Sequence, residues 1–171
     1  MSDVKNRVAI VPGSFDPITA GHLSIVRRAA REYDKVYLAV MINPDKKYMF
    51  TLSERVRIAE AATTEIDNVE VISSEGYLWE LARDLGAVAL VKGVRNENDR
   101  EYELKMAEYN RAHYSDAVTV MLPTEPEYAD LSSTLIREKL ASGEDISKYL
   151  PEEAIEVIKE INSSKEKGLF S

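Results

Sequence analysis

Residues 11–22, VPGSFDPITAGH, decide how the rest of the chain is interpreted. They continue an apolar run at residues 7–11, include two glycines and two prolines, and end in one of the chain's two histidines. An apolar run that stops at such a turn is typical of a buried strand followed by a loop. Thr19 can cap a following helix, which places His22 in the first turn of that helix. Unpaired N–H groups and the positive end of the helix dipole lie in that turn, so it attracts phosphate.

Two interpretations of this stretch stay open on its own residues. It is a phosphate-binding loop, or it is an ordinary turn between a strand and a helix that carries a surface histidine. The glycine patterns GxGxxG and GxxxxGK[ST], which mark other phosphate-binding loops, do not occur in the chain.

Apolar runs alternate with helical patterns along the chain, and this alternation indicates the fold class. The runs are nearly continuous in hydrophobicity, which favours strands buried on both faces; they lie at residues 7–11, 35–41, 69–73, 87–92 and 117–122. Helices are expected at about 20–32, 53–65, 77–85, 99–114, 132–142 and 151–163. We therefore predict an α/β fold: a doubly wound, Rossmann-like five-stranded parallel sheet with helices on both faces. Ligands of such sheets bind beyond the carboxyl ends of the strands.

Composition limits the domain count and the kinds of partner. The chain has 171 residues, of which 44% are apolar, and this suits a single domain, placed at residues 1–162 and followed by a polar tail at 163–171. The formal net charge of -8 argues against nucleic acid or an anionic membrane as a partner. No apolar run approaches the ~20 residues of a membrane span, no signal-like stretch precedes Arg7, and there is no cysteine. A cytoplasmic protein is expected.

A second phosphate-binding candidate lies late in the chain, at LSSTLIR, residues 131–137. Ser132, Ser133 and Thr134 stand at a predicted helix start, where hydroxyls and backbone N–H groups can receive a polyphosphate. Arg137, one turn on, adds positive charge. Read alone, the same residues also fit a serine-rich helix cap with no ligand.

The segment PGSFDPITAGH resembles the phosphate-binding signature of the nucleotidyltransferase superfamily, in the TxGH form found in the bacterial phosphopantetheine adenylyltransferases. LSSTLIR resembles the second signature of that superfamily, and the similarity extends over about residues 5–162. It implies transfer of the adenylyl group of ATP to 4'-phosphopantetheine, which gives dephospho-coenzyme A and pyrophosphate in coenzyme A biosynthesis. It also implies a homohexamer, and coenzyme A is an expected inhibitor because product and substrate share one arm.

The resemblance implies roles for individual residues. His22 is the catalytic residue. The implied ATP-binding residues are Ser14, Phe15, His22, Gly93, Val94, Arg95, Glu103, Tyr128, Ala129, Asp130, Leu131, Ser132, Ser133 and Thr134. The implied residues for the acceptor substrate are Ser14, Lys46, Leu78 and Lys92. Lys92 stands where the family usually has arginine, which keeps the charge but loses the bidentate geometry.

The implied chemistry needs no general base, because the attacking phosphate oxygen is already anionic. The difficulty is negative charge crowded around one phosphorus, so catalysis is positioning plus electrostatic stabilisation. Mg²⁺ is expected to bridge phosphate oxygens, with no dedicated protein ligands.

Two other functions remain open. One is a sister nucleotidyltransferase that acts on nicotinate mononucleotide or glycerol phosphate; the segments KKYMFTLSERV and GVRNENDREYE favour the pantetheine enzyme. The other is a non-catalytic nucleotide-binding module of the same fold. An intact TxGH argues against the module, on the reasoning that a module could lose His22 without harm.

Overall fold

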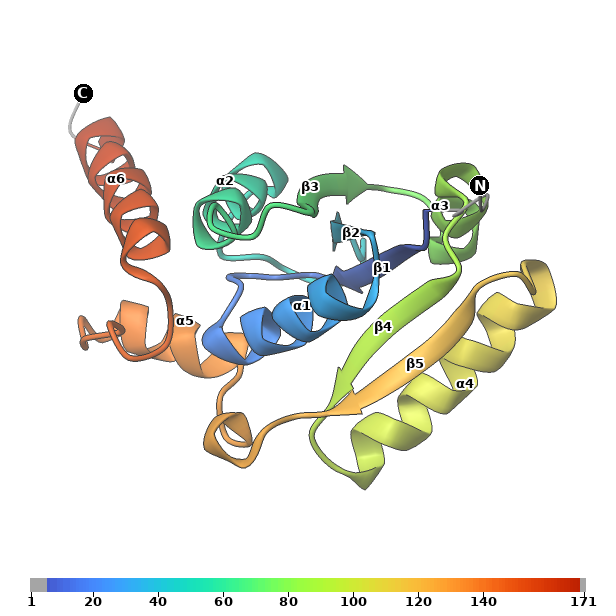
Figure 1. Ribbon diagram of the computed structural model, residues 1–171. Helices are drawn as coiled ribbons and strands as arrows, with labels where there is room; N and C mark the ends of the chain where they lie inside the picture. Colours follow the sequence, from blue (N-terminus) through green and yellow to red (C-terminus); the bar gives the residue numbers. More distant parts are fainter. Residues whose placement is uncertain (1–5, 170–171) are drawn as a thin grey trace.

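A computed structural model describes residues 6–169, with side chains described through residue 165 (Figure 1). Its centre is one open sheet of five parallel strands in the order β3-β2-β1-β4-β5. The strands are β1 (Val8–Gly13), β2 (Lys35–Met41), β3 (Val69–Ser74), β4 (Ala89–Val94) and β5 (Val118–Pro123). The helices are α1 (Ala20–Glu32), α2 (Leu52–Ala62), α3 (Leu78–Leu85), α4 (Glu97–His113), α5 (Ser133–Ala141) and α6 (Glu152–Leu169), with a 3-10 turn η1 (Pro126–Tyr128).

Side chains alternate between two apolar layers along the buried strands. On β1, Ala9 and Val11 join the layer that contains residues of α1, α2, α5 and α6. Ile10, between them, joins the opposite layer, which contains residues of α3. The sheet is thus covered on both faces, and the predicted doubly wound α/β fold is confirmed.

The strand order reverses at β1, which pairs with β2 on one side and with β4 on the other. The chain leaves β1 and β4 toward opposite faces of the sheet, so a crevice opens at their carboxyl ends. The loops singled out from the sequence follow β1, β2 and β4 at this same edge.

The predicted helix boundaries hold where a polar side chain or a glycine fixes them. Thr19 caps α1, with its hydroxyl accepting the N–H of His22. Thr51 and Glu54 form a capping box at the start of α2. Gly86 ends α3 in the left-handed conformation, with φ of 65°.

Several boundaries differ from the prediction. α2 ends at Ala62 rather than at about residue 65, because Thr63 donates its N–H to Glu60, three positions back, and closes the helix. β4 begins at Ala89 rather than at residue 87, because Ala87 still donates its N–H to Ala82 of α3. α6 continues to Leu169, into the predicted polar tail, and Lys165 of this extension pairs with Glu54 of α2 at 3.1 Å. The rest of the predicted tail, residues 170 and 171, lies outside the described residues. Across residues 6–169, no helix combines the length and the hydrophobicity that a membrane crossing requires.

Candidate active site

A cavity of about 710 Å³ opens at the carboxyl ends of β1 and β4. It gathers most residues that the sequence singled out: Ser14, Phe15, His22, Lys46, Lys92, Gly93, Arg95, Glu103, Tyr128, Leu131, Ser132, Ser133 and Thr134. Leu78, Val94, Ala129 and Asp130 are not among the lining residues. Leu78 instead packs beside the apolar layer around Ile10 and Leu90.

The loop after β1 takes its shape from Phe15. This residue has a positive φ of 47°, a left-handed conformation that is uncommon outside glycine. Its buried ring lies against Gly13, where a Cβ atom would stand only 2.9 Å from Phe15 Cζ. The same ring meets His22 edge-on at 5.1 Å between centroids. Glycine is therefore required at position 13 because the ring of Phe15 packs against its backbone. The residue with the positive φ is Phe15 and not Gly13.

His22 is held by Thr19 in one protonation state. The backbone N–H of Thr19 donates to His22 Nδ1 at 3.0 Å, and the N–H of His22 donates to the hydroxyl of Thr19 at 3.3 Å. A ring nitrogen that accepts an N–H carries no proton, so the proton of the neutral ring sits on Nε2. Burial, followed by the charges of Arg95 and Lys92, lowers the pKa of His22 from 6.5 to about 4. At neutral pH the ring is thus an uncharged Nε2–H donor at the cavity wall.

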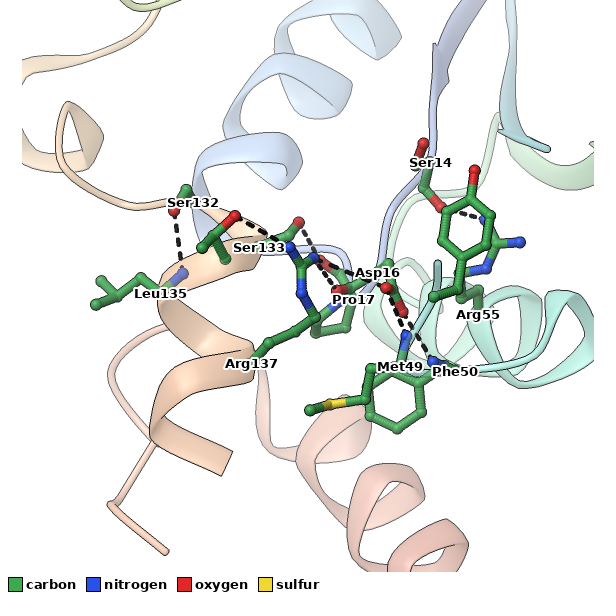
Figure 2. A network of polar contacts seen from close by, with 12 residues as sticks. Ser14, Asp16, Pro17, Met49, Phe50, Arg55, Ser132, Ser133, Leu135 and Arg137 are labelled. Carbon is green, nitrogen blue, oxygen red and sulfur yellow. Dashed lines mark hydrogen bonds and ion pairs between the residues drawn. The ribbon is translucent and has the colours of Figure 1, made fainter. Parts of the chain in front are cut away.

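Figure 2 shows that the hydroxyls of the second signature have structural partners. Ser132 caps α5 by accepting the N–H of Leu135 at 3.1 Å, and Ser133 donates to the carbonyl of Pro17 at 2.8 Å. Thr134 accepts a hydrogen bond from Arg137 at 3.0 Å. Of the three hydroxyls, only that of Ser132 caps the helix. Those of Ser133 and Thr134 bond to Pro17 and Arg137. These contacts do not exclude anion binding, because the N-terminus of α5 lines the cavity with its first-turn N–H groups and dipole.

The cations on the β4 side pair with carboxylates of α4. Lys92 lies 3.3 Å from Glu103, and Arg95 lies 3.2 Å from Asp99. Gly93, between the two cations, lets β4 approach α1, since a Cβ there would lie 3.0 Å from Ile25 Cγ1. The close approach at Gly93 is thus made by a protein side chain.

Two buried charged residues of this region were not found from the sequence. Arg55 of α2 is 2% exposed and donates to the carbonyls of Ser14 and Met41, at 2.7 and 3.1 Å. Its guanidinium lies 3.9 Å from the ring centroid of Tyr48, and burial lowers the pKa of Arg55. Asp16, 3% exposed, stands within the loop after β1. The sequence did carry one sign of this role for Asp16. A carboxylate in a loop that binds phosphate would repel its ligand, so its side chain is expected to point away from the ligand and to bind other protein groups.

The carboxylates around the cavity do not form a metal site of their own. Asp16, Asp99 and Glu103 line it, and each is paired with a basic side chain. Within residues 6–169, no group of three His, Asp or Glu side chains is placed to hold a metal ion. A magnesium ion at this cavity would therefore need most of its oxygen ligands from a bound substrate or from water.

Comparison with known proteins gives the family. A family model described as cytidylyltransferase-like matches residues 10–139, which is more than half of the chain. The chain belongs to the cytidylyltransferase-like family. Family membership agrees with both signatures and with the sheet that presents them.

Several proteins that are similar to this chain have the same name. A phosphopantetheine adenylyltransferase of Heliobacterium modesticaldum is 46% identical over 144 residues, covering 84% of this chain and 86% of its own length. A protein of the same name from Clostridium novyi is 43% identical over 152 residues, covering 89% and 94%. The one from Alkaliphilus metalliredigens is 45% identical over 146 residues, covering 85% and 93%.

Proposed function

We propose that this chain transfers the adenylyl group of ATP to 4'-phosphopantetheine, producing dephospho-coenzyme A and pyrophosphate. Relatives that bear this activity in their name match more than four-fifths of the chain. The observation that carries the proposal is the fixed His22 Nε2–H donor at the cavity, where the N-terminus of α5 and five cationic residues also converge. Those five are Lys46, Lys47, Lys92, Arg95 and Arg137.

The reaction is an in-line displacement at one phosphorus. An oxygen of the acceptor's phosphate attacks the α-phosphorus of ATP, and a new P–O bond forms. The bond from that phosphorus to the oxygen bridging the β-phosphate breaks, and its electron pair leaves with pyrophosphate. No proton has to be removed from the nucleophile. The neutral imidazole of His22 donates Nε2–H to an α-phosphate oxygen as its charge grows, in the manner of an oxyanion donor.

The ATP side of the site is assigned to the α5 end of the cavity and to β4. The first turn of α5, Ser132 to Thr134, receives the outer phosphates at its N–H groups. Arg95 and Glu103 contribute on the opposite wall, and the backbone of Phe15 helps to hold the nucleotide. Val94 and the segment 128–131 complete the nucleotide site in this proposal.

The acceptor side is assigned to Ser14, Lys46 and Lys92, with Leu78 along the pantetheine arm. The ammonium of Lys92 is paired with the carboxylate of Glu103. A phosphate of the acceptor takes the place of this carboxylate beside Lys92 when the acceptor binds. This exchange keeps the charge of Lys92 compensated in both states.

Mg²⁺ is proposed as the cofactor that accompanies ATP. When bound, it would neutralise charge on the phosphates. The residues of this chain then act on the α-phosphate and on the acceptor, as described above.

The test is pyrophosphate release from ATP with and without 4'-phosphopantetheine. We expect release that depends on the acceptor, and dephospho-coenzyme A in equal amount. Nicotinate mononucleotide with ATP, and glycerol phosphate with CTP, are the comparison reactions. Faster turnover with either would replace the pantetheine assignment, whereas ATP binding without release under any acceptor would indicate a non-catalytic module.

Assembly and surroundings are part of the same proposal. We propose a homohexamer in the cytoplasm, with coenzyme A as an inhibitor that competes for the shared arm. Exposed apolar side chains on α4 and at the start of β5, Leu104, Met106, Tyr109 and Val118, support an assembly of some kind. Sedimentation should give six times the chain mass of 19.3 kDa.

A further inference from the structure

Asp16 is a buried acid that the proposed chemistry does not use. Its Oδ2 accepts the backbone N–H of Met49 at 2.9 Å, and its Oδ1 accepts that of Phe50 at 3.0 Å. Figure 2 shows the carboxylate between these two amides on one side and Arg137 on the other. A buried carboxylate is costly unless charge-assisted hydrogen bonds satisfy it, so these contacts are what keep Asp16 in place.

The segment that Asp16 grips is the acceptor loop, defined here as residues 43–50. Within it, Asn43 accepts the N–H groups of Asp45 and Lys46, and the hydroxyl of Tyr48 accepts the N–H of Asn43 at 2.7 Å. These bonds give residues 43–48 their own shape. They do not fix the position of the loop relative to the cavity. That position depends on contacts with other segments.

The opposite side of Asp16 faces α5. Arg137 Nη1 donates to the main-chain carbonyl of Asp16 at 2.9 Å and lies 3.7 Å from its Oδ2. Ser133 donates to the carbonyl of the next residue, Pro17. One residue of the loop after β1 therefore contacts both the acceptor loop and the helix that is proposed to receive the outer phosphates of ATP.

We propose that Asp16 is a positioning residue that sets the acceptor loop, and with it Lys46, at a fixed distance from the ATP end of the site. This inference rests on the proposed function for the identity of the two ligands. Asp16 touches neither ligand in the proposal; it acts through the amides of Met49 and Phe50. Because the contact to Arg137 is partly made by main-chain atoms, the loss of the Asp16 charge disturbs the acceptor loop more than α5.

The first test is Asp16→Asn, which keeps the shape of the side chain and removes its charge. We expect the dissociation constant of 4'-phosphopantetheine to rise about tenfold, the scale of one lost charge-assisted hydrogen bond, while that of ATP changes by less than about twofold. Calorimetry on each ligand separately measures both values. Asp116→Asn is the matched control, because Asp116 is exposed and precedes β5 at the opposite edge of the sheet. An unchanged acceptor affinity in folded Asp16→Asn, or equal losses for both ligands, would overturn the proposal.

A double-mutant cycle separates positioning from general damage. If Asp16 acts through the placement of Lys46, then Asp16→Asn should weaken acceptor binding less when Lys46 is already alanine. Additive losses would show that Asp16 does not act through that lysine.

A third measurement needs no variant and no acceptor. In the native chain, the amides of Met49 and Phe50 should exchange hydrogen at least about tenfold more slowly than that of Lys47 in the exposed part of the loop. Equal rates would refute the grip of Asp16 even if Asp16→Asn failed to fold. Failure of the proposed function is recognised separately, because native protein would then release no acceptor-dependent pyrophosphate whatever the exchange rates.

Discussion

The two sides of the cavity are held together by different kinds of contact. On the β1 side, Asp16 and Arg55 are almost completely buried and bind backbone groups of neighbouring segments. On the β4 side, Lys92 and Arg95 pair with carboxylates of α4 and keep 24% and 40% of their side chains exposed.

This difference gives the two sides of the cavity different properties: the β1 side is rigid, and the β4 side has charges that can change partners. Removing one partner from a buried polar contact leaves the other partner unsatisfied, which makes the β1 side hard to deform. Arg95 and Asp99 keep 40% and 31% of their side chains exposed, and an exposed ion pair contributes only about 0–1 kcal/mol, so phosphate oxygens can replace Asp99 at little cost. The β1 side is therefore suited to fixing reacting groups, and the β4 side to exchanging partners as ligands enter.

The largest effect is expected when the hydrogen-bond donor on the β1 side, the imidazole of His22, is removed. We expect His22→Ala to lower kcat by about 10²–10³-fold, the range for loss of one preorganised donor, while ATP binding changes little. Steady-state kinetics and calorimetry measure the two effects. His113→Ala is the control, since His113 is the other histidine and lies exposed on α4. Near-normal turnover of His22→Ala would remove His22 from the mechanism.

A second substitution tests rigidity on the same side. Arg55→Met leaves the carbonyls of Ser14 and Met41 without their buried donor, and we expect the free energy of unfolding to fall by about 3 kcal/mol. Urea titration measures this change. Arg57→Met, on the exposed face of the same helix and paired with Glu160, should cost less than about 1 kcal/mol. Similar losses in the two variants would contradict the special role of the buried contact.

The β4 side should respond more weakly to an exchange of its cation. Lys92→Arg restores a bidentate phosphate donor, so we expect 4'-phosphopantetheine to bind about two- to fivefold more tightly with little change in kcat. Lys105→Arg makes the same change at an exposed position of α4 and should alter neither value. If Lys92→Arg also alters neither, Lys92 is not an acceptor contact.

The smallest expected effect is that His22 takes up no proton when the pH is lowered from about 8 to 5.5. With a pKa near 4, His22 stays neutral as the pH falls from about 8 to 5.5, so its Hε1 resonance should not move in this range. The folded pKa lies below the unfolded value of 6.5, so between these values the folded chain binds fewer protons and loses stability as pH falls. A midpoint near 6.5, with the resonance assigned by its absence in His22→Ala, would contradict the Nδ1 contact to Thr19.

The sequence was sufficient to predict the fold, and most of the site residues that it singled out line the cavity. Alternating apolar runs and helices lead to a parallel sheet, and the rule on strand ends then brings the loops after β1, β2 and β4 to one edge. Strand limits were less certain at β4, because Ala87 is buried like a strand residue but belongs to the end of α3.

The contacts of the buried charges could not be predicted in the same way. Arg137 and Asp16 are 121 positions apart, and Arg55 and Ser14 are 41 positions apart. Such pairs depend on how helices pack over the sheet, which no local pattern encodes. The aromatic residues around Trp79 illustrate the same limit: Trp79 of α3 stacks on His113 of α4 at 5.0 Å between ring centroids.

The bond between Thr19 and His22 has a consequence for how this protein can evolve. His22 stands where a capping box usually has glutamate or glutamine, so the imidazole that we propose as the phosphate donor also helps to start α1. Selection for a well-folded chain alone would favour keeping this histidine, in the same tautomer, in a descendant that no longer turned over substrate. Lost activity could then return through changes elsewhere, because folding would have preserved the donor in working order.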